Sequence, residues 1–101
     1  MGYYTDFRLE GVSEEIIKDI NDTIFEMDVF YSDGYCDSSM KWYNWTTDMK
    51  EFSKKYPLIL IKLCGIGEDP EDIWEAYFRG GKMQMCWGRI EFDEFNEELL
   101  S

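Results

Sequence analysis

The chain of 101 residues has no histidine, two prolines and three cysteines, and its ten basic residues stand against 22 acidic ones. Histidine is absent and no serine or cysteine stands beside a plausible base, so the chain offers no activated nucleophile. Paired carboxylates could do acid–base chemistry, but a chain of this size has little room for a substrate cleft, so we expect no enzyme. The cysteines, Cys36, Cys64 and Cys86, are odd in number, widely spaced and without a Cys-x-x-Cys pair, which indicates a reducing compartment. We expect Cys64 and Cys86 to be small core residues.

Long apolar runs are also absent. No stretch approaches the roughly 20 apolar residues that span a bilayer, and no basic-then-apolar signal peptide opens the chain, so we expect a cytoplasmic protein. What the chain does have is 45% hydrophobic and 18% aromatic content. This is enough for one hydrophobic core and too little for two, which predicts a single domain over residues 1–101 that needs no disulfide, metal or cofactor.

The first half of the chain predicts a strand, a helix, a hairpin and a second helix. Residues 3–9 alternate aromatic and polar side chains, as strands do. Ser13 is a helix N-cap, and the apolar residues after it recur at helical spacing. Residues 28–32 and 40–45 are β-prone and predict a hairpin with a long polar loop, whereas residues 47–56 predict a helix. The buried face of the first helix is expected to carry Ile16, Ile17, Ile20, Ile24 and Met27.

The second half predicts strands. Residues 58–64 are almost all apolar, which is the pattern of a central strand covered on both faces. Residues 73–78 and 83–92 flank a Gly-Gly turn and predict a second hairpin. Together the elements predict an α+β fold, namely a ferredoxin-like split βαβ sheet with two helices and an extra C-terminal β-hairpin. The apolar residues of the tail, which a short helix is expected to place on the body, are Phe95, Leu99 and Leu100.

The net charge of −12 is unevenly distributed along the chain. Residues 1–37 have a net charge of −8, residues 38–67 of +3, residues 68–75 of −5, residues 76–90 of +3 and residues 91–101 of −5. Alternating blocks of this kind predict an acidic face and a milder basic one. Like charges gathered on a small body reduce stability, but they speed encounters with a basic partner.

Four acidic residues form a stripe on the first predicted helix. Glu15, Asp19, Asp22 and Glu26 follow each other at i, i+4, i+7 and i+11, opposite the isoleucines. Their axial spacing of about 5–6 Å, from a rise of about 1.5 Å per residue, approaches the phosphate spacing of a DNA strand. The stripe is therefore either a mimic of nucleic acid or the solvated face of an ordinary amphipathic helix.

A second acidic group strengthens the first of these interpretations. It comprises Glu68, Asp69, Glu71 and Asp72, and a third group follows in the C-terminal tail. Solubility alone needs less charge than this. The same acidity argues against direct binding of nucleic acid, anionic membranes or phosphate, so we expect a basic protein as the partner.

Two loops invite comparison with ligand sites. Gly65-Ile66-Gly67 follows a strand as a dinucleotide loop does, but Pro70 stands in place of the third glycine and the surrounding acids would repel pyrophosphate. Asp33 and Asp37 do not have the spacing of a calcium loop and would hold a hard cation only weakly. We expect both loops to be structural, with no metal site.

The final hairpin has two different faces. One face is predicted to carry Trp74, Ala76 and Phe78, and the other a mixture of aromatic and charged residues. Such a mixture is typical of protein interfaces. The candidate contacts in this hairpin are Tyr77, Arg79 and Trp87.

Several segments, considered together, resemble a known group of proteins. They are Met1-Gly2-Tyr3-Tyr4-Thr5, Lys41-Trp42-Tyr43, Asp48-Met49 with Lys54-Lys55-Tyr56-Pro57, and Gly67-Glu68 through Asp72-Ile73-Trp74 to Tyr77-Phe78. The chain resembles a group of small phage and prophage proteins of unassigned function in these segments. The resemblance implies a shared fold and a context, because small acidic phage proteins are often inhibitors of host defence, including anti-CRISPR proteins and other DNA mimics.

The hypothesis from the sequence is a non-catalytic inhibitor that docks its acidic face onto the basic, nucleic-acid-binding surface of a bacterial defence protein. Two alternatives remain open. One is an immunity or antitoxin protein that neutralises a nuclease toxin, and the other is a structural or assembly protein that binds through its aromatic hairpin.

Overall fold

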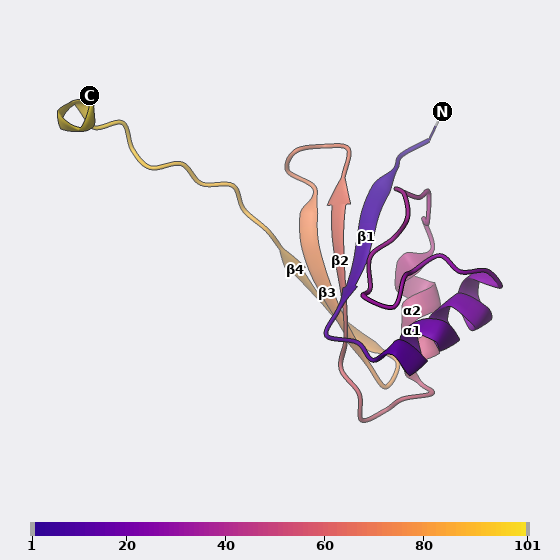
Figure 1. Cartoon of the computed structure of the whole chain (residues 1–101). Helices are drawn as coiled ribbons and strands as arrows, with labels where there is room; N and C mark the ends of the chain where they lie inside the picture. Colours follow the sequence, from indigo (N-terminus) through magenta and orange to yellow (C-terminus); the bar gives the residue numbers. More distant parts are fainter. Residues whose placement is uncertain (1, 101) are drawn as a thin grey trace.

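A computed structural model, which describes residues 2–100, shows a four-stranded antiparallel sheet with two α-helices on one of its faces (Figure 1). Each strand pairs with its neighbour in sequence, in the order β1-β2-β3-β4. The helices are inserted between β1 and β2. The elements are β1 (Thr5–Glu10), α1 (Glu14–Ile20), α2 (Trp45–Ser53), β2 (Ile61–Gly67), β3 (Ile73–Arg79) and β4 (Lys82–Trp87).

The α+β class is confirmed, but the ferredoxin-like split βαβ order is not. All three strand pairings are antiparallel and follow the sequence, so β3 and β4 are part of the sheet rather than an extra hairpin. The expected strands at residues 28–32 and 40–45 are missing. These segments form only isolated bridges, and they use their aromatic residues Phe30 and Trp42 to fill the core instead.

The side chain of Asn21 explains why the segment after the first helix does not become a strand. Its Oδ1 accepts hydrogen bonds from the backbone N–H groups of Val29 and Phe30, at 3.1 and 2.9 Å. Its Nδ2 donates to the carbonyl oxygen of Phe30 at 2.9 Å. A buried amide thus pairs with the backbone groups that a sheet partner would otherwise need.

The first helix begins as expected and ends earlier than expected. Ser13 caps it by accepting a hydrogen bond from the first turn. After Ile20 the chain widens into the π-helix η1 (Asn21–Phe25), which ends at Glu26 with a left-handed backbone, φ 57°. Because the regular helical spacing is lost there, Met27 does not lie on the buried face, and its side chain is 64% exposed.

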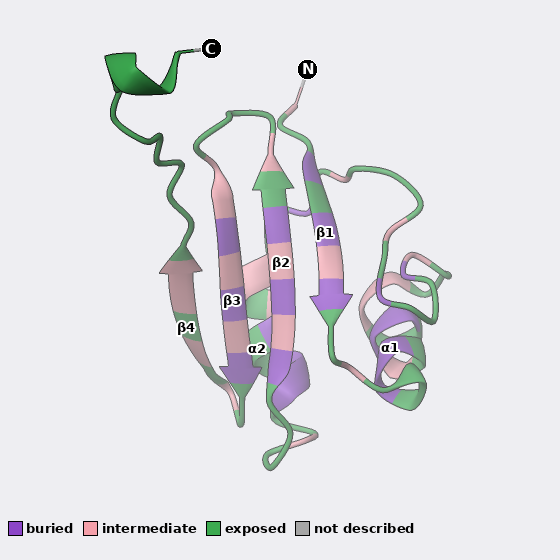
Figure 2. Ribbon diagram, turned by 60° about the vertical axis from the view of Figure 1, so that its left-hand side comes forward, coloured by how far each residue is buried: buried purple, intermediate pink, exposed green. Residues whose placement is uncertain are grey.

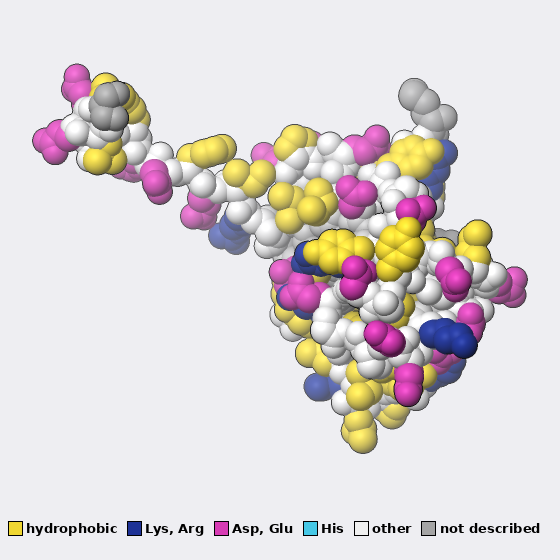
Figure 3. Space-filling view, in the orientation of Figure 1, with side chains coloured by type: hydrophobic (Ala, Val, Ile, Leu, Met, Phe, Trp, Pro, Cys, Tyr) yellow, Lys and Arg dark blue, Asp and Glu magenta, His cyan; other side chains and the backbone are white. Residues whose placement is uncertain are grey.

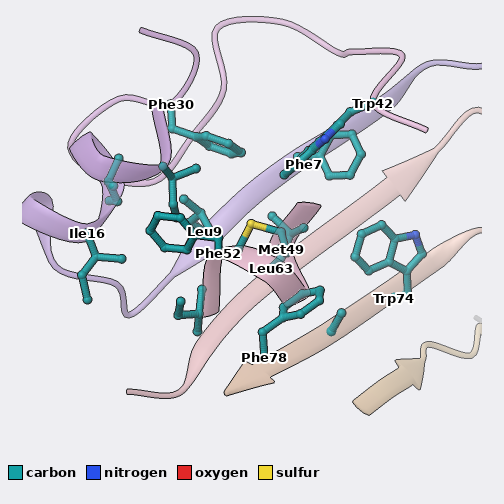
Figure 4. Packing of buried hydrophobic residues seen from close by; sticks show 14 residues of the cluster. Phe7, Leu9, Ile16, Phe30, Trp42, Met49, Phe52, Leu63, Trp74 and Phe78 are labelled. Carbon is teal, nitrogen blue, oxygen red and sulfur yellow. The ribbon is translucent and has the colours of Figure 1, made fainter. Parts of the chain in front are cut away.

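The hydrophobic core lies between the sheet and the helices (Figure 4). Gly65 in β2 allows an especially close contact, since a Cβ at this position would lie 2.1 Å from Cζ2 of Trp74. The ring of Trp74 in turn stacks on Trp45, with 4.1 Å between the ring centroids and 8° between the planes. The sheet contributes to the core Phe7, Leu9, Ile61, Leu63, Trp74, Ala76 and Phe78, and the helices contribute Ile16, Ile17, Ile20, Met49 and Phe52.

The other face of the sheet is not covered by any described element (Figure 2). Burial alternates along β2 and β3, so residues 58–64 are not a strand covered on both faces. Leu58 is 90% exposed and precedes the strand. Cys64 and Cys86 lie on the open face and are half-buried, because their parity is opposite to that of the core residues.

The segment that follows β4, which we call the C-terminal arm (residues 88–100), extends away from the body (Figure 1). The short 3-10 helix η2 (Glu97–Leu99) lies near its end. The expected packing of the tail on the body is wrong, since Phe92 is 90%, Phe95 78% and Leu99 77% exposed. Over residues 2–100, no helix has the length and apolar character required to span a membrane.

Candidate functional site

The predicted acidic stripe is interrupted. Glu15, Asp22 and Glu26 are exposed, as a docking surface requires, but α1 ends between the first and second of them. The π-helical turn changes the angular spacing after Ile20, so the four acids do not follow one regular helix. Asp19 is half-buried and belongs to a contact within the molecule.

The carboxylate of Asp19 connects α1 to the segment after α2. It accepts hydrogen bonds from Nζ of Lys55 at 2.8 Å, from the hydroxyl of Tyr56 at 2.6 Å and from the hydroxyl of Thr23 at 2.8 Å. These donors, Lys55 foremost, lower the pKa of Asp19 from its ordinary 3.8 to about 2. Asp19 therefore stabilises the packing of α1 against the segment after α2, and its carboxylate is only partly available to a partner.

The second acidic group is divided in the same way. Glu68 accepts a hydrogen bond from the backbone N–H of Tyr4 at 3.0 Å, and Asp72 accepts one from the hydroxyl of Tyr3 at 2.6 Å. Both acids fasten the N-terminal segment beside β2 and β3. Asp69 and Glu71, in contrast, are exposed on the loop between these strands.

Few acidic side chains are compensated by a neighbouring base. Between described residues, the ion pairs use four of the 22 acids, namely Glu10, Asp19, Glu51 and Glu75. Figure 3 shows acidic side chains over the surface that carries α1 and its adjoining loops, with fewer basic ones between them. The negative charge is thus directed into solvent rather than neutralised within the protein.

The open face of the sheet carries a small charge network instead. Lys62 lies between Glu10 and Glu75, with Nζ 2.9 Å from a carboxylate oxygen of each. Glu10 also pairs with Arg8. Lys62 lowers the pKa of Glu10, and hydrogen bonds to Glu10 and Glu75 raise the pKa of Lys62. Charges that pair with each other in this way give little attraction to an outside partner.

The three hairpin candidates do not share one face. Tyr77 and Arg79 lie on the open face, where Tyr77 donates a hydrogen bond to Glu75 at 3.2 Å. Trp87 lies opposite Trp74 in the β3–β4 register, and paired residues point to the same side of a sheet. Trp87 is therefore on the side of the helices, although it is 62% exposed at the edge.

Trp87 borders a cleft lined by nine residues, which we call the aromatic cleft. Its volume is about 200 Å³. It lies at the end of the sheet that the helices leave open, beside the start of α2. The sequence did not reveal it, because its walls come from segments that are far apart in the chain. The nine residues are Tyr3, Thr5, Trp42, Tyr43, Trp45, Asp72, Trp74, Met85 and Trp87.

Cys36 and Cys64 are not activated thiols. Burial raises the pKa of Cys36 to about 12 and also raises that of Cys64, so both thiols remain protonated near neutral pH. Among residues 2–100, no group of Cys, Asp and Glu side chains is arranged to hold a metal ion. Comparison with protein-family models, with curated proteins and with solved structures found no match to the chain.

Proposed function

We propose that the protein is a non-catalytic inhibitor of the anti-CRISPR or wider anti-defence type, which binds the basic, nucleic-acid-binding surface of a bacterial defence protein. One observation carries the proposal, namely the excess of exposed acids over the four that form ion pairs between described residues. A surface of this kind attracts a basic groove and repels nucleic acid itself.

The exposed part of the acidic surface defines the residues that carry the binding. Glu15, Asp22 and Glu26 on the side of α1, and Asp69 and Glu71 on the β2–β3 loop, face solvent. Asp19 and Glu68 use carboxylate oxygens in hydrogen bonds within the molecule. They add to the long-range attraction and not to direct contacts.

A competition experiment tests the proposal. The tagged protein is incubated with nuclease-treated bacterial lysate, and each captured protein is purified and tested for nucleic-acid binding by gel mobility shift. We expect the inhibitor to displace nucleic acid and its affinity to fall steeply as salt rises. A captured protein that binds nucleic acid equally well with and without the inhibitor would contradict the proposal.

Two variants with equal charge changes locate the surface. Glu15→Gln/Asp22→Asn/Glu26→Gln removes three charges near α1, and we expect roughly tenfold weaker binding from about 0.5 kcal/mol for each exposed pair. Glu94→Gln/Glu97→Gln/Glu98→Gln removes three charges from the C-terminal arm and should leave the affinity nearly unchanged. Equal losses in both variants would show that net charge alone, and no particular surface, determines binding.

A second candidate function, an assembly protein that binds through apolar surface, is favoured by the C-terminal arm. Phe92, Phe95 and Leu99 are more than three quarters exposed, which is costly in water unless a partner covers them. In that case Phe92→Ser/Phe95→Ser would abolish binding, whereas reversing the charge of Asp22 would leave it intact. The same captured partner therefore distinguishes the two functions.

A further inference from the structure

We propose that the aromatic cleft binds a cationic side chain, the guanidinium of arginine or the ammonium of lysine, presented by a protein partner. The inference deepens the proposed function, on which it rests for the basic character of that partner. Dispersed surface charge attracts a partner without fixing the orientation of the two proteins. A defined site for one cationic side chain would fix that orientation.

The walls of the cleft are aromatic and partly open to solvent. Trp87 and Tyr43 are 62% and 61% exposed, although both are large aromatic residues that proteins normally cover. Behind them Trp45 and Trp74 stack in parallel at 4.1 Å, and Trp74, at 4% exposure, is the buried base of the cleft. The β3–β4 register places Trp87 directly opposite Trp74. The faces of such rings are negative and attract cations.

A carboxylate completes the site. Asp72 lines the cleft, and its Oδ2 is held by the hydroxyl of Tyr3 at 2.6 Å. That hydroxyl also accepts a hydrogen bond from the backbone N–H of Asp69 at 3.1 Å, and the backbone N–H of Tyr3 donates to the hydroxyl of Tyr43 at 2.9 Å. The carboxylate and two of the aromatic rings are thus positioned before any ligand arrives.

Gly67 makes this arrangement possible. A Cβ at this position would lie 2.1 Å from Oδ2 of Asp72 and 2.3 Å from the hydroxyl of Tyr3. Only glycine allows the two groups to approach β2 so closely. Any larger residue would separate the carboxylate from the aromatic walls.

The chemistry of the walls selects a cation over other ligands. An anion would be repelled by Asp72 and by the neighbouring acids Glu68, Asp69 and Glu71, and a neutral apolar group would desolvate Asp72 without pairing it. A planar guanidinium stacks on indole and donates to a carboxylate at the same time. The same end of the molecule already holds one ammonium group in this way, since Nζ of Lys41 lies 5.1 Å from the ring centroid of Tyr4.

Titration with small ligands tests the site without any partner. The probes are N-acetyl-arginine amide and its neutral isostere N-acetyl-citrulline amide, followed by NMR of the tryptophan indole N–H signals of the full chain. We expect the arginine ligand to shift the signals of Trp45, Trp74 and Trp87 and to bind at least about tenfold more tightly than citrulline. Equal binding of the two ligands would overturn the inference.

Variants identify the groups responsible. Trp87→Ala should weaken arginine binding about two- to thirtyfold, the range of cation–π interactions, whereas Trp87→Phe keeps an aromatic face and should retain most of it. Asp72→Asn should also weaken binding. Its matched control is Asp37→Asn, because Asp37 accepts an identical hydrogen bond from Tyr31, at 2.6 Å, away from the cleft. Equal effects of the two Asp→Asn changes would contradict the assignment.

The outcomes separate this inference from the proposed function. If arginine binds the cleft but captured partners are not displaced from nucleic acid, the proposed function is wrong and the site remains. If displacement is observed but Trp87→Ala binds the partner as tightly as the unaltered protein, the inference is wrong and the function remains.

Discussion

Asp19 joins the two helical segments through its bonds to Lys55 and Tyr56, and this contact depends on pH. Because the pKa of Asp19 is lowered from 3.8 to about 2, its contribution to stability is complete above pH 3.8 and disappears as the pH falls through 2. We expect Asp19→Asn to lower the free energy of unfolding at pH 7 by about 1 kcal/mol, a moderate value because the carboxylate is partly exposed. Urea denaturation at pH 7 measures this loss.

The control for this prediction is Asp22→Asn, which removes the same charge from an exposed position close by. It should change the free energy of unfolding by less than about 0.5 kcal/mol. The loss caused by Asp19→Asn should also shrink when the pH is lowered towards 2. Equal effects of the two substitutions at pH 7 would show that general charge repulsion, and not the bonds of Asp19, determines the result.

At the scale of elements, the contact between β2 and the indole of Trp74 leaves no space for a larger side chain at Gly65. Gly65→Ala would place a methyl group 2.1 Å from Trp74, which has no room to move because it stacks on Trp45. We expect a loss of about 1–3 kcal/mol in the free energy of unfolding, as overpacked cores show. Chemical denaturation, followed by near-UV circular dichroism of the tryptophans, measures it.

The double variant Gly65→Ala/Trp74→Phe is the control, since a smaller ring leaves space for the methyl group. Its loss of stability should be smaller than the sum of the two single losses. If the losses simply add, the close approach of Gly65 to Trp74 is not the cause of the effect.

Elements with strong local signals were predictable from the sequence. The Ser13 cap, the alternation in β3 and the glycine turn before β4 depend on neighbouring residues alone, and all three are confirmed. The absence of a strand at residues 28–32, in contrast, depends on a competitor in another element. Asn21 takes up backbone groups of this segment, and no local rule indicates that a helix residue will do so.

The candidate sites, too, were predictable only where neighbouring residues determine them. Sequence spacing identified the acids of α1 but not the π-helical turn that interrupts their stripe. It also grouped Trp87 with Tyr77 and Arg79 as contacts of the hairpin, whereas the register with Trp74 places Trp87 on the side of the helices. The hydrogen bond between Tyr3 and Asp72 connects the N-terminal segment to the residue before β3. It forms because β1 and β3 both pair with β2.

For the whole molecule, the C-terminal arm determines the overall dimensions. The radius of gyration is 16.5 Å, whereas a compact chain of this length has about 13 Å. A chain that ends after Gly88 should give roughly 12 Å in small-angle X-ray scattering, and its free energy of unfolding should remain within about 0.5 kcal/mol, because residues 89–100 are all exposed. A radius near 13 Å for the full chain, or a large loss of stability on truncation, would show that the arm packs on the body.

Cleavage of a single peptide bond in the same arm would change the net charge of the protein. Proteases bind extended, exposed backbone, and the stretch after Gly88 offers it directly beside a sheet that they cannot enter. One cut there releases five acids and one arginine, which changes the net charge from −12 to −8. A protease would thereby lower the net negative charge by a third and leave the folded body, with its aromatic cleft, intact.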